Sequence, residues 1–155
     1  MPAAEIGVSN FSPRQIEPLL ELEVPAVLQL ELHPLLQRPM LRAFCERHGI
    51  LLQAYGHYKP ELEHQPVLRQ LVQPTQLPNL VPKPAGLLAM RWSLQAGAAA
   101  IPRSRTLLQL EANLHLFWRG FEQLLPPPTA AALEALDRNQ SLYGLHDVFV
   151  RDLIS

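Results

Sequence analysis

Cysteine, long apolar runs and secretion signals are scarce or missing in this sequence. Cys45 is the only cysteine, so an intrachain disulfide is impossible. Apolar stretches are interrupted well before the roughly 18 residues that a membrane-spanning helix needs, and the first residues lack the basic and hydrophobic segments of a signal peptide. We therefore expect a soluble, cytoplasmic protein with no membrane partner.

A surplus of charge of either sign is also missing. The 13 basic residues nearly balance the 14 acidic residues, and no basic run stands out. Nucleic acids and anionic membranes bind through clustered positive charge, so neither is an expected partner. With 48% hydrophobic residues, the chain has enough apolar mass for a single globular domain over residues 1–155.

Proline is abundant, and it separates alternating strand-like and helix-like segments. The 16 prolines are about twice the usual proportion and are spread along the chain. Short apolar strands are predicted at residues 6–8, 27–32, 50–55 and 98–101, each followed by a helix-like segment. This order is typical of a parallel α/β fold.

Residues that start and end helices support this division. Ser12, Pro13 and Gln15 form a capping-box pattern at the first helix, and Gly49 suits the end of the second. Thr129 is predicted to cap the last helix, after three prolines that break the chain. The helices are predicted at residues 13–23, 39–48, 83–96, 104–114 and 129–137.

Two segments do not fit the alternation. Five prolines interrupt residues 56–82, which are predicted to be a long surface loop that can form a short helix at 66–72. Residues 140–155 are predicted to be a C-terminal tail.

Polar side chains follow the ends of the predicted strands, where a parallel α/β barrel assembles its binding face. Ser9, Asn10 and Gln29 are neutral groups that can grip an amide by donating and accepting hydrogen bonds at once. The flat ring of Tyr55 can stack on an aromatic ring beside that amide. A nicotinamide carboxamide fits this description.

A phosphate site is predicted at the turn after the fourth strand. Arg103 and Ser104 can bind a phosphate through the guanidinium, the hydroxyl and the N–H groups at the start of the following helix. One elongated ligand that carries an amide-bearing ring and phosphates would occupy this turn and the strand ends together.

Five motifs occur in the order seen in aldo-keto reductases, and together they make the chain resemble that family from residue 6 to about residue 139. The motifs are Ile-Gly-Val-Ser-Asn-Phe at 6–11, Gln-x-Glu-x-His-Pro at 29–34, Ala-Tyr at 54–55, Arg-Trp-x-Leu-Gln-x-Gly followed by Ile-Pro-Arg-Ser at 91–104, and Leu-Asp-Arg-Asn at 136–139. The resemblance implies four βα units, equivalent to strands 5–8 of a TIM-type (β/α)8 barrel, with a C-terminal helix and tail.

The resemblance also implies an NADPH site. In the family, the residues that match Ser9, Asn10 and Gln29 hold the nicotinamide carboxamide, and the residue that matches Tyr55 stacks on the nicotinamide ring. The position of Arg103, beside Ser104, contacts the adenosine 2′-phosphate, and Asn113 matches the asparagine that binds adenine.

Most departures from the family pattern lie at positions that bind the phosphates of the cofactor in the family. Gln109 stands where the family usually has an arginine that clamps the 2′-phosphate, and Arg105 is the candidate substitute. Gly56 stands where many members have a serine that touches the pyrophosphate. We therefore expect weak binding that discriminates poorly between NADPH and NADH.

No catalytic residue is assigned to the chain. In the family, the catalytic Tyr, Lys, Asp and His lie on the first four barrel strands, whereas this sequence begins at the equivalent of the fifth. The adjacent pair Tyr58 and Lys59 is a poor replacement, because neighbouring side chains of an extended segment point in opposite directions.

Other chemically capable side chains favour structural roles. Cys45 lies on an apolar helix face and is predicted to pack in the core, and His33 is predicted to be a structural hydrogen bonder. The cluster at 57–64 has no recognised metal-binding spacing, so a solvated loop is favoured over a metal site. Its members are His57, Glu61, Glu63 and His64.

Half a barrel leaves three interpretations open. The chain is part of a full-length reductase, a half-barrel that pairs with a second copy or a complementing chain, or an open sheet that has lost redox function. The leading functional hypothesis is the cofactor-binding half of an NAD(P)H-dependent reductase, inactive on its own. The alternative is a non-enzymatic interaction or regulatory module derived from such a half-barrel.

Overall fold

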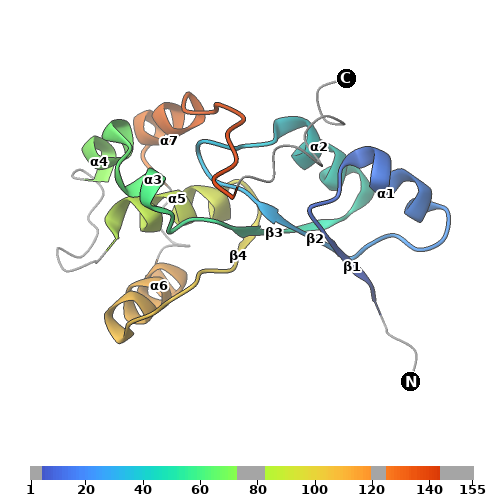
Figure 1. The fold of residues 1–155 in the computed structure, drawn as a ribbon, viewed down its shortest axis with the longest axis horizontal. Coiled ribbons are helices and arrows are strands. Elements are labelled where there is room, and N and C mark those ends of the chain that lie inside the picture. Colours follow the sequence, from blue (N-terminus) through green and yellow to red (C-terminus); the bar gives the residue numbers. More distant parts are fainter. Residues whose placement is uncertain (1–4, 73–82, 120–124, 144–155) are drawn as a thin grey trace.

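The structure, a computed structural model, describes residues 5–72, 83–119 and 125–143. Four parallel strands form one sheet in the order β1-β2-β3-β4, so each strand pairs with its neighbour in sequence. The predicted α/β half-barrel architecture is confirmed (Figure 1). The strands are β1 (Gly7–Ser9), β2 (Val27–Glu31), β3 (Leu51–Tyr55) and β4 (Ala99–Ala100).

Proline starts most of the helices that the structure describes. Among the helices that the structure describes, all except α6 begin at a proline. Proline suits this position because its ring presets a helical φ and its missing N–H would have no helical partner there. The helices are α1 (Pro13–Leu20), α2 (Pro39–His48), α3 (Pro60–Glu63), α4 (Pro66–Val72), α5 (Pro84–Gln95), α6 (Leu107–Arg119) and α7 (Pro127–Glu134).

Most predicted helix boundaries are close to those observed. The Ser12 N–H donates to Gln15 Oε1 at 2.8 Å in the predicted capping box, and Gly49 ends α2 with a φ of 69°. The prediction that Thr129 caps the last helix is wrong, since Thr129 lies in the first turn of a helix that begins at Pro127. Consecutive prolines at positions 127 and 128 enter this helix rather than preceding it, because neither needs a helical N–H partner there.

The segment 56–82 contains more packed structure than a surface loop. It includes α3 and α4, which contribute the fully buried Leu62 and Leu68 and lie beside α5 (Figure 1). The short helix predicted at 66–72 is present as α4. Residues 73–82 of the predicted loop and 144–155 of the predicted tail lie outside the described residues.

The core lies between the sheet and its helices. Leu28 and Leu30 of β2 pair in register with Leu52 and Ala54 of β3, and all four side chains are buried. Cys45 of α2 packs in the same cluster, as predicted, and burial raises the pKa of its thiol to about 11. No helix among the described residues has the length and apolar character needed to cross a membrane.

The opposite sheet face is much more open. Gln29 is exposed, and Leu51 retains 67% of its accessible surface. Within the described residues, β1 and β4 each pair on one side only. Unpaired strand edges and exposed apolar groups favour association with another chain.

We expect the isolated chain to self-associate through this open sheet face. Sedimentation at several concentrations should show mass increasing with concentration, and Leu51→Glu should weaken the association because it places a charge on that face. Leu22→Glu is the matched control, since Leu22 is 82% exposed but lies in the turn after α1. A cooperatively melting monomer at every concentration would contradict the expectation.

Candidate functional site

Three of the predicted ligand-binding side chains meet at the carboxyl ends of β1 and β3. The Tyr55 hydroxyl donates to Asn10 Oδ1 at 2.9 Å, and Asn10 Nδ2 donates to Ser9 Oγ at 3.2 Å. Asn10 has a φ of 59°, a left-handed conformation that asparagine tolerates better than most residues. The turn after β1 thus places the Asn10 amide beside the Tyr55 ring.

Gln29 adds a second carboxamide next to this group. The Asn10 N–H donates to the backbone oxygen of Gln29 at 2.8 Å, and Gln29 is paired in register with Ser9. Its side-chain Nε2 donates to Gln53 Oε1 at 3.3 Å on the open sheet face. The structure therefore brings Ser9, Asn10, Gln29 and Tyr55 near one another, although Gln29 lies in the middle of β2 and not at its end as the sequence pattern predicts.

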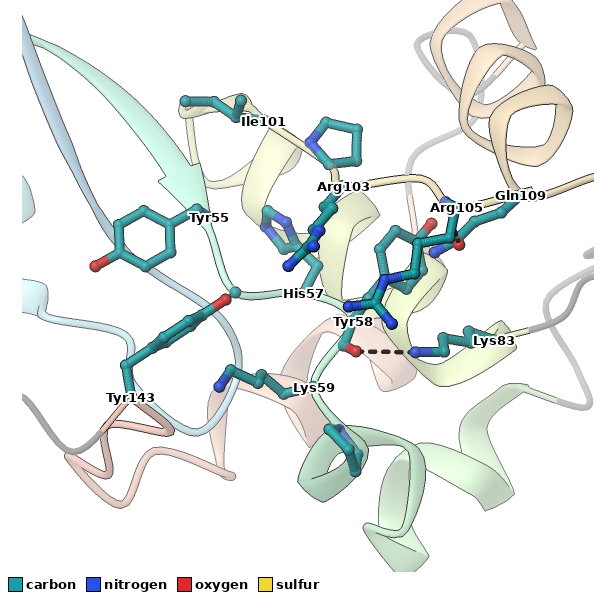
Figure 2. A pocket seen from close by; sticks show the side chains of 13 residues that line it. Tyr55, His57, Tyr58, Lys59, Lys83, Ile101, Arg103, Arg105, Gln109 and Tyr143 are labelled. Atoms are coloured by element: carbon teal, nitrogen blue, oxygen red, sulfur yellow. Dashed lines mark hydrogen bonds between the residues drawn. The ribbon is translucent and has the colours of Figure 1, made fainter. Parts of the chain in front are cut away.

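A cavity of about 390 Å³ opens beside Tyr55 and continues toward the start of α6 (Figure 2). Four cationic side chains line it, and no Asp or Glu is among the described residues that form its wall. A site with this charge favours an anion. The cations are Lys59, Lys83, Arg103 and Arg105.

Tyr55 and Arg103 are the predicted residues that line this cavity directly. Ser104 and Asn113 lie behind the wall, where Asn113 Nδ2 donates to Ser104 Oγ at 2.8 Å. Asn113 is buried, and its Oδ1 accepts a hydrogen bond from the Tyr58 hydroxyl. Arg103, Ser104 and Asn113 therefore share one corner of the site, but the Asn113 amide already has protein partners.

Gln109 and Arg105 differ in exposure at this corner of the site: Gln109 is buried, whereas Arg105 is exposed. The buried Gln109 lines the cavity and accepts a long hydrogen bond from the Arg105 N–H to its Oε1, at 3.4 Å. Its own N–H donates to Thr106 Oγ1 at 3.2 Å, so Thr106 caps α6. The Arg105 side chain is exposed at the cavity wall and is available to an anion.

Lys59, Lys83 and Tyr143 were missed as site residues. Lys59 lies within the proline-rich segment 56–82 that the sequence predicts to be a surface loop, and Lys83 directly follows it. The contact of Tyr143 with the site depends on tertiary structure. Tyr58 and Lys59 do point apart: Tyr58 reaches Asn113, whereas Lys59 Nζ lies 3.6 Å from the centre of the Tyr143 ring (Figure 2).

His57 and Glu63, near the cavity, have structural partners. His57 Nε2 lies 3.0 Å from Ser93 Oγ, and burial, with a smaller contribution from His33, lowers the pKa of His57 to about 3. Glu63 Oε1 accepts the Gly86 N–H at 2.7 Å. Within the described part of the chain, no three His, Cys, Asp or Glu side chains are grouped closely enough to hold a metal ion.

Glu31, at the end of β2, binds the start of the C-terminal tail through hydrogen bonds. Its carboxylate accepts hydrogen bonds from Ser141 Oγ and from the Leu142 N–H, and lies 3.1 Å from His33 Nε2, which gives His33 the predicted structural role. Burial alone would raise the pKa of Glu31. The hydrogen bonds from His33, Ser141 and Leu142 outweigh burial and hold this pKa below its usual value.

The same tail brings Tyr143 onto the cavity. Its ring meets Tyr55 edge to face, with ring centroids 5.3 Å apart and an interplanar angle of 81°. The hydrogen bonds of Glu31 with residues 141 and 142 therefore hold the chain directly before Tyr143, whose ring lies beside Tyr55.

The fold is a parallel α/β half-barrel with a cavity lined by four cationic side chains near its strand ends. Comparisons with known proteins agree with this fold. The chain is 33% identical over 147 residues to prostaglandin-E(2) 9-reductase of Oryctolagus cuniculus, covering 88% of this chain and 44% of that protein. It is 36% identical over 135 residues to an aldo-keto reductase of Mycolicibacterium vanbaalenii, covering 85% of this chain and 45% of that protein. No protein-family model matches.

The comparison of structures points the same way. The aldose reductase from Schistosoma japonicum superposes with a TM-score of 0.75 at 26% identity, over 92% of this chain and 44% of that one. The chain belongs to the aldo-keto reductase family and spans less than half the length of the curated relatives cited here.

We predict that Glu31→Gln loosens the tail and removes part of the acid sensitivity. A carboxyl whose pKa is lowered on folding stabilises the protein above its ordinary pKa of 4.5, and this contribution is lost as pH falls through the lower folded value. At pH 7 the substitution should cost about 1–3 kcal/mol of unfolding free energy, because charged acceptors make the stronger hydrogen bonds.

Denaturant unfolding at pH 7 and across the range from about pH 5 to pH 3 tests this prediction. Glu17→Gln on the exposed side of α1 is the matched control, expected to change stability by less than about 0.5 kcal/mol. An acid-unfolding curve for Glu31→Gln that parallels the unmodified chain would show that this carboxylate has no such role.

Proposed function

We propose that the chain is the cofactor-binding half of an NAD(P)H-dependent aldo-keto reductase. The observation that carries the proposal is the cavity that runs from Tyr55 to the start of α6, whose wall includes four cations and no carboxylate among the described residues. An anionic dinucleotide with a nicotinamide at one end matches this distribution of charge and aromatic surface.

The donor set at the strand ends fits the nicotinamide part. Ser9, Asn10 and Gln29 offer donors and acceptors for a carboxamide, and Tyr55 offers a ring beside them on which nicotinamide can stack. Because the Tyr55 hydroxyl is tied to Asn10, both groups are oriented before a ligand arrives.

The charge distribution fits the phosphate part. Arg103 and Arg105 would hold the 2′-phosphate with Ser104, and Lys59 and Lys83 would offset the charge of the diphosphate. His57 remains neutral at physiological pH because its pKa is lowered to about 3, so the lysines and arginines supply the positive potential. Asn113 is the proposed neighbour of the base.

In such a site the cofactor and the protein would contribute different parts of the reaction. A bound nicotinamide cofactor supplies the hydride for carbonyl reduction, and the residues of this chain bind and orient it. The similarity to reductases favours this function over the non-enzymatic module considered from the sequence. A cytoplasmic location accords with the single buried cysteine.

The proposed phosphate site should discriminate weakly between NADPH and NADH. Arg103→Ala should weaken NADPH binding about tenfold and NADH binding much less, since a hydrogen bond to a charged group contributes about 1.5–3 kcal/mol before solvent screening. Isothermal titration of both cofactors measures this, with Arg47→Ala at the exposed end of α2 as the control. If Arg103→Ala left both the NADPH affinity and the preference for NADPH over NADH unchanged, Arg103 would not be the residue that binds the 2′-phosphate.

The 155-residue chain on its own should not reduce carbonyls. Its adjacent tyrosine and lysine point to Asn113 and Tyr143 respectively, so they cannot act together as an acid pair, and lost acid catalysis removes about 10² to 10⁴ in rate. Purified chain with NADPH and a panel of aldehydes provides the assay. Turnover of about 1 per second or faster, after contaminating reductases are excluded, would contradict the expectation.

A further inference from the structure

Lys59 places a positive charge at the aromatic end of the cavity. Its Nζ lies 3.6 Å from the centre of the Tyr143 ring, a distance at which an ammonium is attracted to the face of the ring. Lys83, the other lysine of the cavity wall, instead donates to the backbone oxygen of Tyr58 at 3.2 Å. Figure 2 shows Lys59 extending to Tyr143, whereas Lys83 ends at Tyr58. The two lysines therefore have different neighbours within one cavity.

Tyr143 connects the Lys59 ammonium to the ring of Tyr55. Because the centroids of the two tyrosine rings are 5.3 Å apart, the ammonium lies within about 9 Å of the Tyr55 ring, comparable to the Debye length at physiological salt. The chain directly before Tyr143 is held by the hydrogen bonds of Glu31 with residues 141 and 142. A ligand ring stacked on Tyr55 would therefore be exposed to the charge of Lys59.

Three other charged groups act on Tyr143, namely Glu31, Arg103 and Glu61. Glu31 is fully buried and hydrogen-bonded, and Glu61 is exposed to solvent, which screens its charge. In the proposed function, a phosphate would offset the charge of Arg103. A substitution at Lys59 leaves all three groups in place, so a comparison of variants isolates the contribution of Lys59.

We propose that Lys59 is a specificity-determining residue that makes the site favour the reduced nicotinamide cofactor over the oxidised one. The reduced nicotinamide ring is uncharged, whereas the oxidised ring is a cation, and a nearby ammonium repels a cation. Lys59 therefore destabilises the oxidised complex relative to the reduced complex, which favours loading with the hydride donor. This inference rests on the proposed cofactor-binding function.

Isothermal titration of NADPH and NADP⁺ tests the proposal, because the two ligands have the same phosphates and adenine and differ only in the nicotinamide ring. Lys59→Met keeps a long side chain and removes the charge. The ratio of the NADP⁺ to the NADPH dissociation constant should fall about threefold to tenfold, the effect of one unit charge at this separation near a protein surface. Any lost attraction for the phosphates acts on both ligands and cancels in the ratio.

Lys83→Met is the matched control, because it removes the same charge from the same cavity at a place beside Tyr58. It should weaken both cofactors and leave the ratio within about twofold of its original value. Lys59→Arg retains the charge and should retain the ratio. Thermal unfolding of each variant establishes that it is folded.

Two substitutions of Tyr143 test whether its ring positions the Lys59 ammonium. Tyr143→Phe keeps a ring and should keep the ratio, whereas Tyr143→Leu should lower the ratio. In a Lys59→Met background, Tyr143→Leu should have no further effect on the ratio, because the charge that it positions is already absent. A general loss of packing would instead lower both affinities in either background.

The outcomes separate this inference from the function on which it rests. An unaltered ratio in folded Lys59→Met, or an equal fall in Lys83→Met, would overturn the role of Lys59 and leave cofactor binding intact. If Lys59→Met does not fold, an unaltered ratio in Tyr143→Leu overturns that role instead. Failure of both NADPH and NADP⁺ to bind the unmodified chain would overturn the cofactor-binding function and this inference together.

Discussion

The parallel pairing of β2 with β3 is the interaction on which the rest of the structure depends. Leu28 pairs with Leu52 and Leu30 with Ala54, and this register puts all four side chains into the core against the helices. Side chains alternate along a strand, so Gln29 necessarily faces the other way. A slip of one residue would exchange the two faces and disrupt both the core and the proposed ligand-binding residues.

The segment between β3 and α5 supplies one wall of the cavity at the end of the sheet. Leu62 and Leu68 are fully buried, and Glu63 accepts the N–H of Gly86, so α3 and α4 are fastened to α5 by apolar and polar contacts. That packing brings Lys59 and Lys83 near the turn that carries the arginines. Positive charge thereby becomes concentrated in a chain whose formal net charge is only −1.

Buried polar groups connect the remaining parts of the site. Glu31 accepts hydrogen bonds from the tail, and Tyr58 donates one to Asn113 on α6. Such groups are costly to bury unless they are paired, so each pair couples the positions of two distant segments. Residues 141–142 and α6 are thus located by specific hydrogen bonds as well as by apolar packing.

The sequence by itself determined the alternation of strands and helices, the capping of α1, the end of α2 and the placement of Ser9, Asn10 and Tyr55 at strand ends, whereas Gln29 lies in the middle of β2. These features depend on neighbouring residues, and the family motifs lie within short runs. The prediction of a helix start was wrong where two local signals competed. Thr129 is a typical cap residue, but α7 begins two residues earlier, at Pro127. Only the tertiary structure decided that Tyr58 binds Asn113, 55 residues away, and that Ser141 binds Glu31, 110 residues away. Those contacts arise from how whole elements pack, which no local periodicity encodes.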